Sequence, residues 1–522
     1  MNAPVRSPTR EGGRRSHGAR RFFASRSCYA GPDMENGTLL AAVDLGSNSY
    51  RLEIGRYDHG LIQRVEYLKE TVRQGGGLDA NRNLTPEAME RGWDCLARFG
   101  ERLAAFEPSN VRAVATQTLR EARNRDDFLA RAQDALGFPI EVIAGREEAR
   151  LIYQGVSRLL PQSKERRLVI DIGGRSTELI LGQGFTAHTL ESFRVGSVAW
   201  SQKYFPEGDL SASAFERAEV AAKAVLDEAL AAYPRKAWDC AYGASGTVGA
   251  VADVLAASGW EGQGVTREGL AWLRDELVAA RRADRVDLAG LKEDRRPVIG
   301  GGLSVLRAVF DLLQIDTLQP AQGALRHGVL YDLIDRQGTD TDLRAATVAG
   351  LAARFGVDTV QAERVAEVAG QLLRQLRGDA RTLRKLTWAA RLHEIGSQIA
   401  HSEHHKHGAY ILEHADAPGF SQPEMHRLGL LVLGHRGKLR KLQVDFEDDV
   451  FVQQLLSLRL AVILCHARRD PQLEGLRLAR RGSALMLQLP EGWTQAWPQS
   501  AHLLREEVVA WQKTPCEFRL AE

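Results

Sequence analysis

The sequence predicts two α/β domains followed by an α-helical third domain. Up to about residue 336, segments with the alternating pattern of strands are interspersed with segments of helical periodicity. One strand–turn–strand pattern occurs twice within that part of the chain. Beyond about residue 339 the strands fade and helical periodicity continues past Ile463. With 522 residues, the chain is long enough for about three domains of ordinary size.

The first predicted domain opens with a β-hairpin. Residues 39–44 and 51–57 read as strands on either side of a Gly/Ser/Asn turn. A Thr-Pro-Glu start at Thr85 begins a helix, because apolar residues at helical spacing follow it. Residues 111–116 are then predicted to form a strand and residues 126–136 a helix.

The second predicted domain starts in a similar way. Residues 167–171 and 178–181 read as another hairpin, and a glycine-rich turn at 243–247 leads into a helix over 248–255. The predicted bounds are 1–37 for a basic extension, 38–160 and 161–336 for the two α/β domains, and 337–522 for the helical domain.

The predicted extension differs from the rest of the chain. It is rich in arginine, glycine, serine and proline and has little hydrophobic periodicity. Because such a segment cannot bury a core, we interpret it as disordered, or as sequence read from a start codon before the true one at Met34. A basic tail that docks on an anion and a transit peptide are the alternatives.

Composition limits the function classes. A formal net charge of +2 argues against a generic polyanion binder, so we expect a local anion site and no nucleic-acid partner. The five cysteines are scattered and show no CxxC spacing, which favours reduced thiols and a cytoplasmic location. No apolar run approaches the ~20 residues that span a bilayer, so we expect no stable membrane insertion.

An internal repeat locates the predicted chemistry. The segment AVDLGSNSYRLEIG, residues 42–55, aligns without gaps with VIDIGGRSTELILG, residues 169–182. Each segment reads as an apolar strand, an Asp, a Gly, small or polar residues with a Ser, and a second strand that ends in Gly. The repeat predicts a duplicated domain whose two turns face one cleft.

The residue types of these turns suit phosphate. Glycine lets backbone N–H groups come close to an anion, and serine hydroxyls add donors. An Asp that ends a strand can hold a hydrated Mg²⁺, which bridges to phosphate oxygens. One such turn alone would be an ordinary tight turn, and the gapless pair is what favours function. A third turn, YGASGT at 242–247, could hold another phosphate at a helix start or be a simple tight turn.

A series of motifs resembles one family. The run DLGSNS is followed by ATQTLREARN, AGREEARLIYQGV, DIGGRSTELILG, YGASGT, DRRPVIGGGLSVL, GALRHGVLYDLI, LHEIG, HKHGAYIL and GHRGK. From about residue 38 onward this series resembles the exopolyphosphatase/guanosine pentaphosphate phosphohydrolase family in its long form, and most of all exopolyphosphatase. The resemblance implies two ribonuclease-H-like domains of the actin, sugar-kinase and Hsp70 type, an all-α HD-like third domain and a homodimer.

The resemblance also implies roles for individual residues. Glu148 matches a general base for water, and Asp171 and Glu178 match carboxylates that hold Mg²⁺. The implied phosphate-binding residues are Asp44, Gly46, Ser47, Asn48, Arg120, Gly173, Gly174 and Ser176, to which the third turn adds Gly243, Ser245 and Gly246. Hydrolysis of a phosphoanhydride needs an oriented water and groups that stabilise charge on the phosphate oxygens. Without the resemblance, Glu147 and Glu148 would read as first-turn acids favoured by the helix dipole.

One residue departs from the family pattern. The second turn usually reads DIGGGSTE, and Arg175 stands here in place of the third glycine. Arg175 could obstruct the terminal phosphate if the position needs a positive φ, clamp the phosphate, or fold outward. Because its counterpart in the first turn is Asn48, a side chain is tolerable there, and we expect activity to be retained.

The predicted function is Mg²⁺-dependent exopolyphosphatase activity, the removal of terminal phosphate from inorganic polyphosphate, with possible stimulation by a monovalent cation. Hydrolysis of guanosine pentaphosphate to the tetraphosphate is the alternative that uses the same loops and base. An ATP-dependent kinase, and a non-catalytic polyphosphate-binding regulator disabled by Arg175, are the remaining alternatives.

Histidines and basic residues gather in the third domain. His393-Glu394 stands where HD phosphohydrolases carry His-Asp, and we interpret it as vestigial HD-like scaffolding rather than a second active site. The basic residues at 435–441, with the histidines at 404–407, are either a track for long polyphosphate or a solvated surface.

Overall fold

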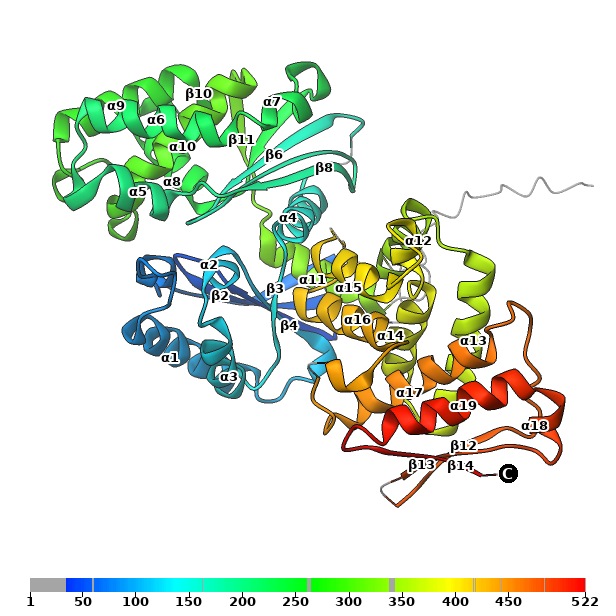
Figure 1. Cartoon of the computed structure of the whole chain (residues 1–522). Coiled ribbons are helices and arrows are strands. Elements are labelled where there is room, and N and C mark those ends of the chain that lie inside the picture. The colour runs from blue at the N-terminus through cyan, green and yellow to red at the C-terminus, as the bar shows by residue number, and fades with distance from the viewer. Residues whose placement is uncertain are drawn as a thin grey trace, which may run out of the picture.

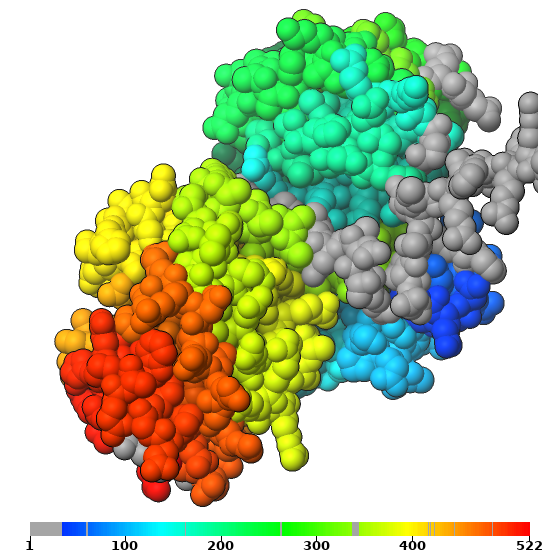
Figure 2. All heavy atoms as spheres, turned by 90° about the vertical axis from the view of Figure 1, so that its right-hand side faces the viewer, coloured from blue at the N-terminus to red at the C-terminus, as the bar shows by residue number. Residues whose placement is uncertain are grey.

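The computed structural model describes residues 34–58, 61–161, 163–260, 264–337, 343–415, 417, 419–442, 444–482 and 484–521. Figure 1 shows three bodies in chain order: a blue and cyan sheet domain, a green sheet domain above it, and a helical body in yellow to red. Figure 2 shows the same division as lobes of the space-filled molecule. The predictions made for residues 1–33 lie outside the described residues.

The first domain is a five-stranded sheet in the order β3-β2-β1-β4-β5. Strands β1 to β3 are antiparallel neighbours, and β4 and β5 extend the sheet in parallel from β1. Their bounds are Leu39–Leu45, Tyr50–Asp58, Leu61–Glu70, Val111–Ala115 and Ile140–Val142 for β1 to β5. The helices are α1 (Pro86–Leu103), α2 (Gln117–Glu121) and α3 (Arg125–Leu136). Thr85 caps α1 as predicted, because its side chain accepts a hydrogen bond from Ala88 N.

The second domain repeats this arrangement in a six-stranded sheet, in the order β10-β11-β9-β6-β7-β8. The strands are β6 (Arg166–Ile172), β7 (Thr177–Gln183), β8 (Thr186–Phe193), β9 (Cys240–Gly243), β10 (Val265–Thr266) and β11 (Thr317–Pro320). The helices are α5 (Ser197–Tyr204), α6 (Ala212–Leu226), α7 (Ala229–Ala232), α8 (Gly246–Leu255), α9 (Arg267–Ala280) and α10 (Ile299–Leu313).

The shared strand order confirms the predicted duplication. In each sheet, three antiparallel strands are followed by strands that join the first of them in parallel, β4 beside β1 and β9 beside β6. This order is the ribonuclease-H-like arrangement that the resemblance implied. Since β1 and β6 occupy equivalent places, the turns that follow them emerge at equivalent edges of the two sheets.

Two helices cross between the α/β domains. Helix α4 (Gly145–Leu159) packs against α11 (Leu325–Gln337) and against strands β7 and β8. One continuous core joins both helices to both sheets through residues such as Leu40 and Val169. The approach is close at Gly328, where any Cβ would overlap the backbone of Leu151. Helix α4 is therefore packed between the two sheet domains (Figure 1).

The C-terminal body is mainly helical, as predicted, but it is not all-α. Its helices are α12 (Leu343–Arg354), α13 (Thr359–Gln375), α14 (Ala380–Arg391), α15 (His404–His414), α16 (Gln422–Gly434), α17 (Asp449–Leu464), α18 (Trp493–Ala496) and α19 (Pro498–Trp511). A three-stranded sheet follows them in the order β12-β13-β14, with bounds Arg477–Arg481, Ala484–Gln488 and Glu517–Ala521. Each of these strands is only five residues long, which explains why the sequence pattern did not reveal them. Within the described ranges, no helix is long and apolar enough to cross a membrane.

Candidate active site

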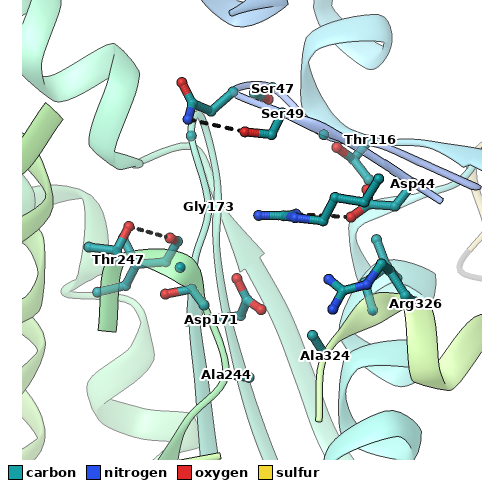
Figure 3. Close-up of a pocket in the computed structure, with 18 of the residues that line it drawn as sticks. Asp44, Ser47, Ser49, Thr116, Asp171, Gly173, Ala244, Thr247, Ala324 and Arg326 are labelled. Atoms are coloured by element: carbon teal, nitrogen blue, oxygen red, sulfur yellow. Dashed lines mark hydrogen bonds and ion pairs between the residues drawn. The ribbon is translucent and has the colours of Figure 1, made fainter. Parts of the chain in front are cut away.

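The two predicted turns line one cavity between the α/β domains. Its volume is about 400 Å³, and polar side chains dominate its wall. Figure 3 shows Asp44, Ser49 and Thr116 on the side of the first domain, facing Asp171 and Thr247 of the second. The predicted residues that line the cavity are Asp44, Gly46, Ser47, Asn48, Glu148, Asp171, Gly173, Gly174, Ser176, Ser245 and Gly246.

The glycines of the two turns allow close contacts with neighbouring atoms; they are not needed for unusual backbone angles. Neither Gly46, Gly173 nor Gly174 has a positive φ. A Cβ on Gly46 would lie 2.9 Å from Ser49 O, and one on Gly174 would lie 2.8 Å from Ser47 Cβ. Because Gly174 lacks a side chain, the turn of the second domain touches the turn of the first, and the two form one wall of the cavity.

Equivalent positions in the two hairpins carry different charges. Asp44 is paired in register with Arg51, and their side chains form an ion pair at 3.1 Å. Asp171 is paired in register with Glu178, so the same position in the second hairpin carries two carboxylates. The first hairpin is thus neutralised internally, whereas the second needs a cation from elsewhere.

Glu148 lies in the first turn of α4, buried at the cavity wall. The Arg120 guanidinium lies beside it, with Nη1 2.8 Å from Glu148 Oε2 and also 2.8 Å from Ile143 O, to which it donates. Burial raises the pKa of Glu148, while the charge of Arg120 acts in the opposite direction. Arg120 therefore favours the ionised carboxylate that a base must present. Arg120 does not line the cavity, so its predicted contact with phosphate stays a prediction.

Three neighbouring carboxylates make a cation favourable at this place. Burial, and next the charge of Glu148, raise the pKa of Asp171 to about 7. Burial, followed by the charges of Glu148 and Asp171, raises the pKa of Glu178 well above its ordinary value. Each carboxylate therefore resists ionisation unless positive charge is nearby.

The donor set fits a partly hydrated Mg²⁺. Asp171 faces the cavity, and Glu178 lies behind it, with Oε1 accepting from the Ser192 hydroxyl at 2.7 Å. Glu178 Oε2 is buried and has no hydrogen-bond partner, as expected of an oxygen meant for an ion or its water. In the part of the chain that the structure describes, no three Asp, Glu, His or Cys side chains converge as a complete metal cage. Mg²⁺ needs no such cage, because it commonly keeps waters and binds one or two carboxylates plus phosphate oxygens.

The third turn contributes through two of its three predicted residues. Ser245 and Gly246 line the cavity, and the Ser245 side chain caps α8 by accepting from Val248 N. Gly243 does not line it; a Cβ there would lie 2.5 Å from a methyl group of Val248. Gly243 thus lies in helix–strand packing, and its predicted contact with phosphate stays a prediction.

The cavity also contains cations that the sequence analysis missed. They come from strands β2 and β3, from the loop before α10 and from the start of α11: Arg51, Lys69, Lys292, Arg295 and Arg326. Burial, and next the charge of Arg51, lower the pKa of Arg295, a sign of clustered positive charge without enough counter-charge. Arg295 and Arg326 lie inside the DRRPVIGGG and GALRHGV motifs, which was the signal available in the sequence.

Arg175 folds away from the cavity. It is absent from the cavity lining, and its φ is not positive. Its Nε and Nη2 donate to Glu121 at 3.1 and 2.8 Å, and its Nη1 donates to Gly75 O at 3.0 Å. Of the three predicted possibilities, the outward fold is the one observed, so this side chain neither obstructs nor clamps a phosphate in the cavity.

Glu147, next to Glu148, anchors α4 to the C-terminal body. Its carboxylate accepts two hydrogen bonds from Arg150 at 2.8 Å and one from Gly419 N at 2.9 Å. Arg336 of α11 donates to Gly419 O at 3.1 Å, so Gly419 is held from both sides. The remaining members of this network are Arg112, Glu141 and Asp332.

Several histidines of the C-terminal body come together, but among the residues that the structure describes they form no cluster suited to a metal ion. The rings of His393 and His435 are 5.3 Å apart, and those of His404 and His435 are 5.4 Å apart. Burial lowers the pKa of all three. The Glu394 carboxylate pairs instead with Arg468 at 2.8 Å. His435 is buried, so it cannot belong to a surface track.

The chain matches the Ppx/GppA phosphatase family over residues 54–337 and domain III of Ppx/GppA phosphatases over residues 343–508. A guanosine-5'-triphosphate,3'-diphosphate pyrophosphatase of Vibrio campbellii is 40% identical over 479 residues, covering 90% of this chain and 95% of that protein. A protein of the same name from Vibrio parahaemolyticus is 39% identical over 491 residues, covering 91% and 98%. The crystal structure of an exopolyphosphatase from Cytophaga hutchinsonii is 25% identical with a TM-score of 0.52, covering 58% of this chain and all of that one. The chain therefore belongs to the Ppx/GppA phosphatase family.

Proposed function

We propose that this protein hydrolyses the terminal phosphoanhydride bond of guanosine pentaphosphate, leaving the tetraphosphate and orthophosphate. The observation that supports hydrolysis is the cavity itself, where a buried carboxylate on α4 faces two serine-bearing turns and a set of cations. Such a site suits a reaction in which a water attacks phosphorus and charge spreads over the phosphate oxygens.

Glu148 is the proposed base. Arg120, which does not line the cavity, pairs with this carboxylate and favours its ionised form, so that Glu148 can orient a water and accept its proton. Ser47 and Ser176, one from each turn, offer hydroxyl donors to the phosphate, and Arg326 and Arg295 offer positive charge. The kinase alternative would need, in place of water, a second substrate whose hydroxyl accepts the phosphate.

Asp171 and Glu178 are the proposed holders of Mg²⁺. When bound, the ion would neutralise the charge of the transferred phosphate. The two carboxylates would then ionise, since the cation removes the repulsion that raises their pKa values.

The names of the similar proteins favour guanosine pentaphosphate over the substrate that the sequence analysis put first. Relatives at 39–40% identity that span nearly the whole chain are named guanosine-5'-triphosphate,3'-diphosphate pyrophosphatase. Inorganic polyphosphate is the second candidate, because the solved exopolyphosphatase of Cytophaga hutchinsonii shares the fold at lower identity. We further propose a cytoplasmic location and a homodimer, both on the family resemblance alone.

The test is orthophosphate release from guanosine pentaphosphate and from polyphosphate, with and without Mg²⁺. We expect a higher kcat/KM for the nucleotide and loss of release in Glu148→Gln. Glu87→Gln, which changes an exposed acid of α1, is the matched control and should behave as wild type. A higher kcat/KM for polyphosphate would reverse the order of the two substrates. Equal release from Glu148→Gln and wild type would contradict the assignment of the base.

A further inference from the structure

Arg175 is the start of a hydrogen-bonded chain that joins the two domains. It leaves the phosphate turn of the second domain and reaches the first, where Glu121 accepts at 2.8 and 3.1 Å and Gly75 O at 3.0 Å. Both charged side chains are largely shielded from solvent, with 18% of Arg175 and 13% of Glu121 exposed. Gly75 N donates to Ser47 O at 2.7 Å, so the same glycine also holds the first phosphate turn.

The chain continues from Glu121 to the proposed base. The other oxygen of Glu121 accepts from Gln117 Nε2 at 2.6 Å. The oxygen of Gln117 accepts from Arg120 Nε and Nη2 at 3.0 and 2.7 Å. The remaining end of Arg120, Nη1, lies 2.8 Å from Glu148 Oε2 and donates to Ile143 O. Every nitrogen of the Arg120 guanidinium is therefore directed by a named partner.

We propose that Arg175 is a positioning residue for Glu148, which it orients through Glu121, Gln117 and Arg120 when the two phosphate turns are together. Each half of the phosphate site belongs to a different domain, so the site is complete only when the turns touch at Gly174 and Ser47. The Arg175–Glu121 pair can form only in that arrangement. Closure of the site and orientation of the base are thus coupled through hydrogen bonds from Arg175 to Arg120 and a final ion pair between Arg120 and Glu148. The proposal rests on the proposed function, because it assigns Glu148 the role of base.

Each member of the chain depends on the one before it for a hydrogen-bond partner. Glu121 without Arg175 would keep only the Gln117 amide as a partner among the contacts described here, and it would be free to turn toward solvent. Gln117 would then lose the partner that fixes its amide, and the acceptor it presents to Arg120 would no longer be held in place. A glycine at position 175 supplies no link of this kind, so the departure from the usual glycine adds a connection rather than removing a function.

The first experiment compares Arg175→Gln with Gln117→Ala and with the double variant. Arg175→Gln removes the charge and the forked donor but keeps a polar side chain. We expect each single variant to lower kcat about tenfold, with substrate KM changed less than about threefold, because orientation rather than binding is lost. Since both act through one chain, the double variant should also lose about tenfold rather than about a hundredfold.

Gln202→Ala is the matched control. Gln202 makes another contact between the two domains on the same side, from Nε2 to Gly76 O at 3.3 Å, but it has no link to Glu148. We expect its kcat and KM to match wild type. A hundredfold loss in the double variant would overturn the proposal. So would a raised KM with unchanged kcat in Arg175→Gln, because that result would mean that Arg175 only holds the domains together.

A second measurement does not depend on turnover. Amide hydrogen exchange should become faster at Arg120, Ala122 and Glu148 in Arg175→Gln, and should stay as in wild type in Gln202→Ala. These three amides donate within the segments that the chain holds. If wild type hydrolyses neither substrate, the proposed function fails while this measurement still decides the coupling. Faster exchange confined to the turns at 73–77 and 173–176 would overturn the proposed coupling between Arg175 and Glu148.

Discussion

Replacing Glu147 by glutamine should destabilise the protein while leaving its chemistry in place. The Glu147 side chain is 1% exposed and belongs to a network of three arginines and three acids: Arg112, Arg150, Arg336, Glu141, Glu147 and Asp332. Glutamine has nearly the same shape but leaves one positive charge in excess. Removing one partner of a buried ion pair costs about 3–5 kcal/mol. Because the amide oxygen can still accept one hydrogen bond, we expect the lower end, about 3 kcal/mol.

The adjacent residue should behave in the opposite way. Burial outweighs the charge of Arg120 and raises the pKa of Glu148, so its surroundings taken together favour the neutral form over the charged one. Glu148→Gln should therefore cost less than about 1 kcal/mol in stability, yet lower turnover at least about a hundredfold if Glu148 is the base. Of these two neighbouring acids at the start of α4, Glu147 would thus contribute to stability and Glu148 to catalysis.

Stability is measured by urea unfolding, monitored by tryptophan fluorescence and by circular dichroism. Activity is measured as orthophosphate release in buffer without urea. Glu147→Gln should shift the unfolding midpoint to lower urea and keep kcat within about tenfold of wild type. An equal loss of stability in both variants would refute the distinction drawn from burial and partners. So would a Glu147→Gln protein of wild-type stability that releases no phosphate.

Three further outcomes are expected. Gly328→Ala should destabilise the protein by about 3 kcal/mol or more, measured by urea unfolding, because its Cβ would overlap the backbone of Leu151 and force α4 and α11 apart. Asp171→Asn should weaken Mg²⁺ binding about tenfold or more in a calorimetric titration, and unchanged affinity would place the ion elsewhere. Burial alone would raise the pKa of Glu53, but hydrogen bonds and charges from His327 and Arg326 lower it to about 2. Since that pKa lies below the ordinary 4.5, Glu53 stabilises the protein above pH 4.5, and at most about 3 kcal/mol is lost as the pH falls toward 2. Glu53→Gln should therefore flatten the stability curve between those pH values.

The sequence predicted the parts of the site that lie within single motifs. The two turns carry their own spacing, and a gapless repeat identifies Asp44 and Asp171 as equivalent without any structure. The cations of the cavity were missed because Lys69 and Arg295 are distant in the chain and meet only through the fold. The direction of Arg175 was open for the same reason, since its partner Glu121 belongs to the other domain.

Gly243 shows the opposite difficulty. A glycine that admits a neighbouring methyl group and a glycine that admits a phosphate look alike in a sequence, because both are defined by what lies next to the missing Cβ. The C-terminal sheet was hidden by a similar ambiguity, because five-residue strands carry too little periodicity to stand out from a helical background.

Two consecutive acids on α4 face different parts of the molecule, one the C-terminal body and the other the cavity. Gly419 docks on Glu147, and Glu148 faces the cavity. By thermodynamic reciprocity, a ligand whose binding tightens the docking of the C-terminal body would itself bind more strongly, by the same factor, when that body is docked. The C-terminal body can therefore influence ligand binding in a cavity that none of its described residues lines.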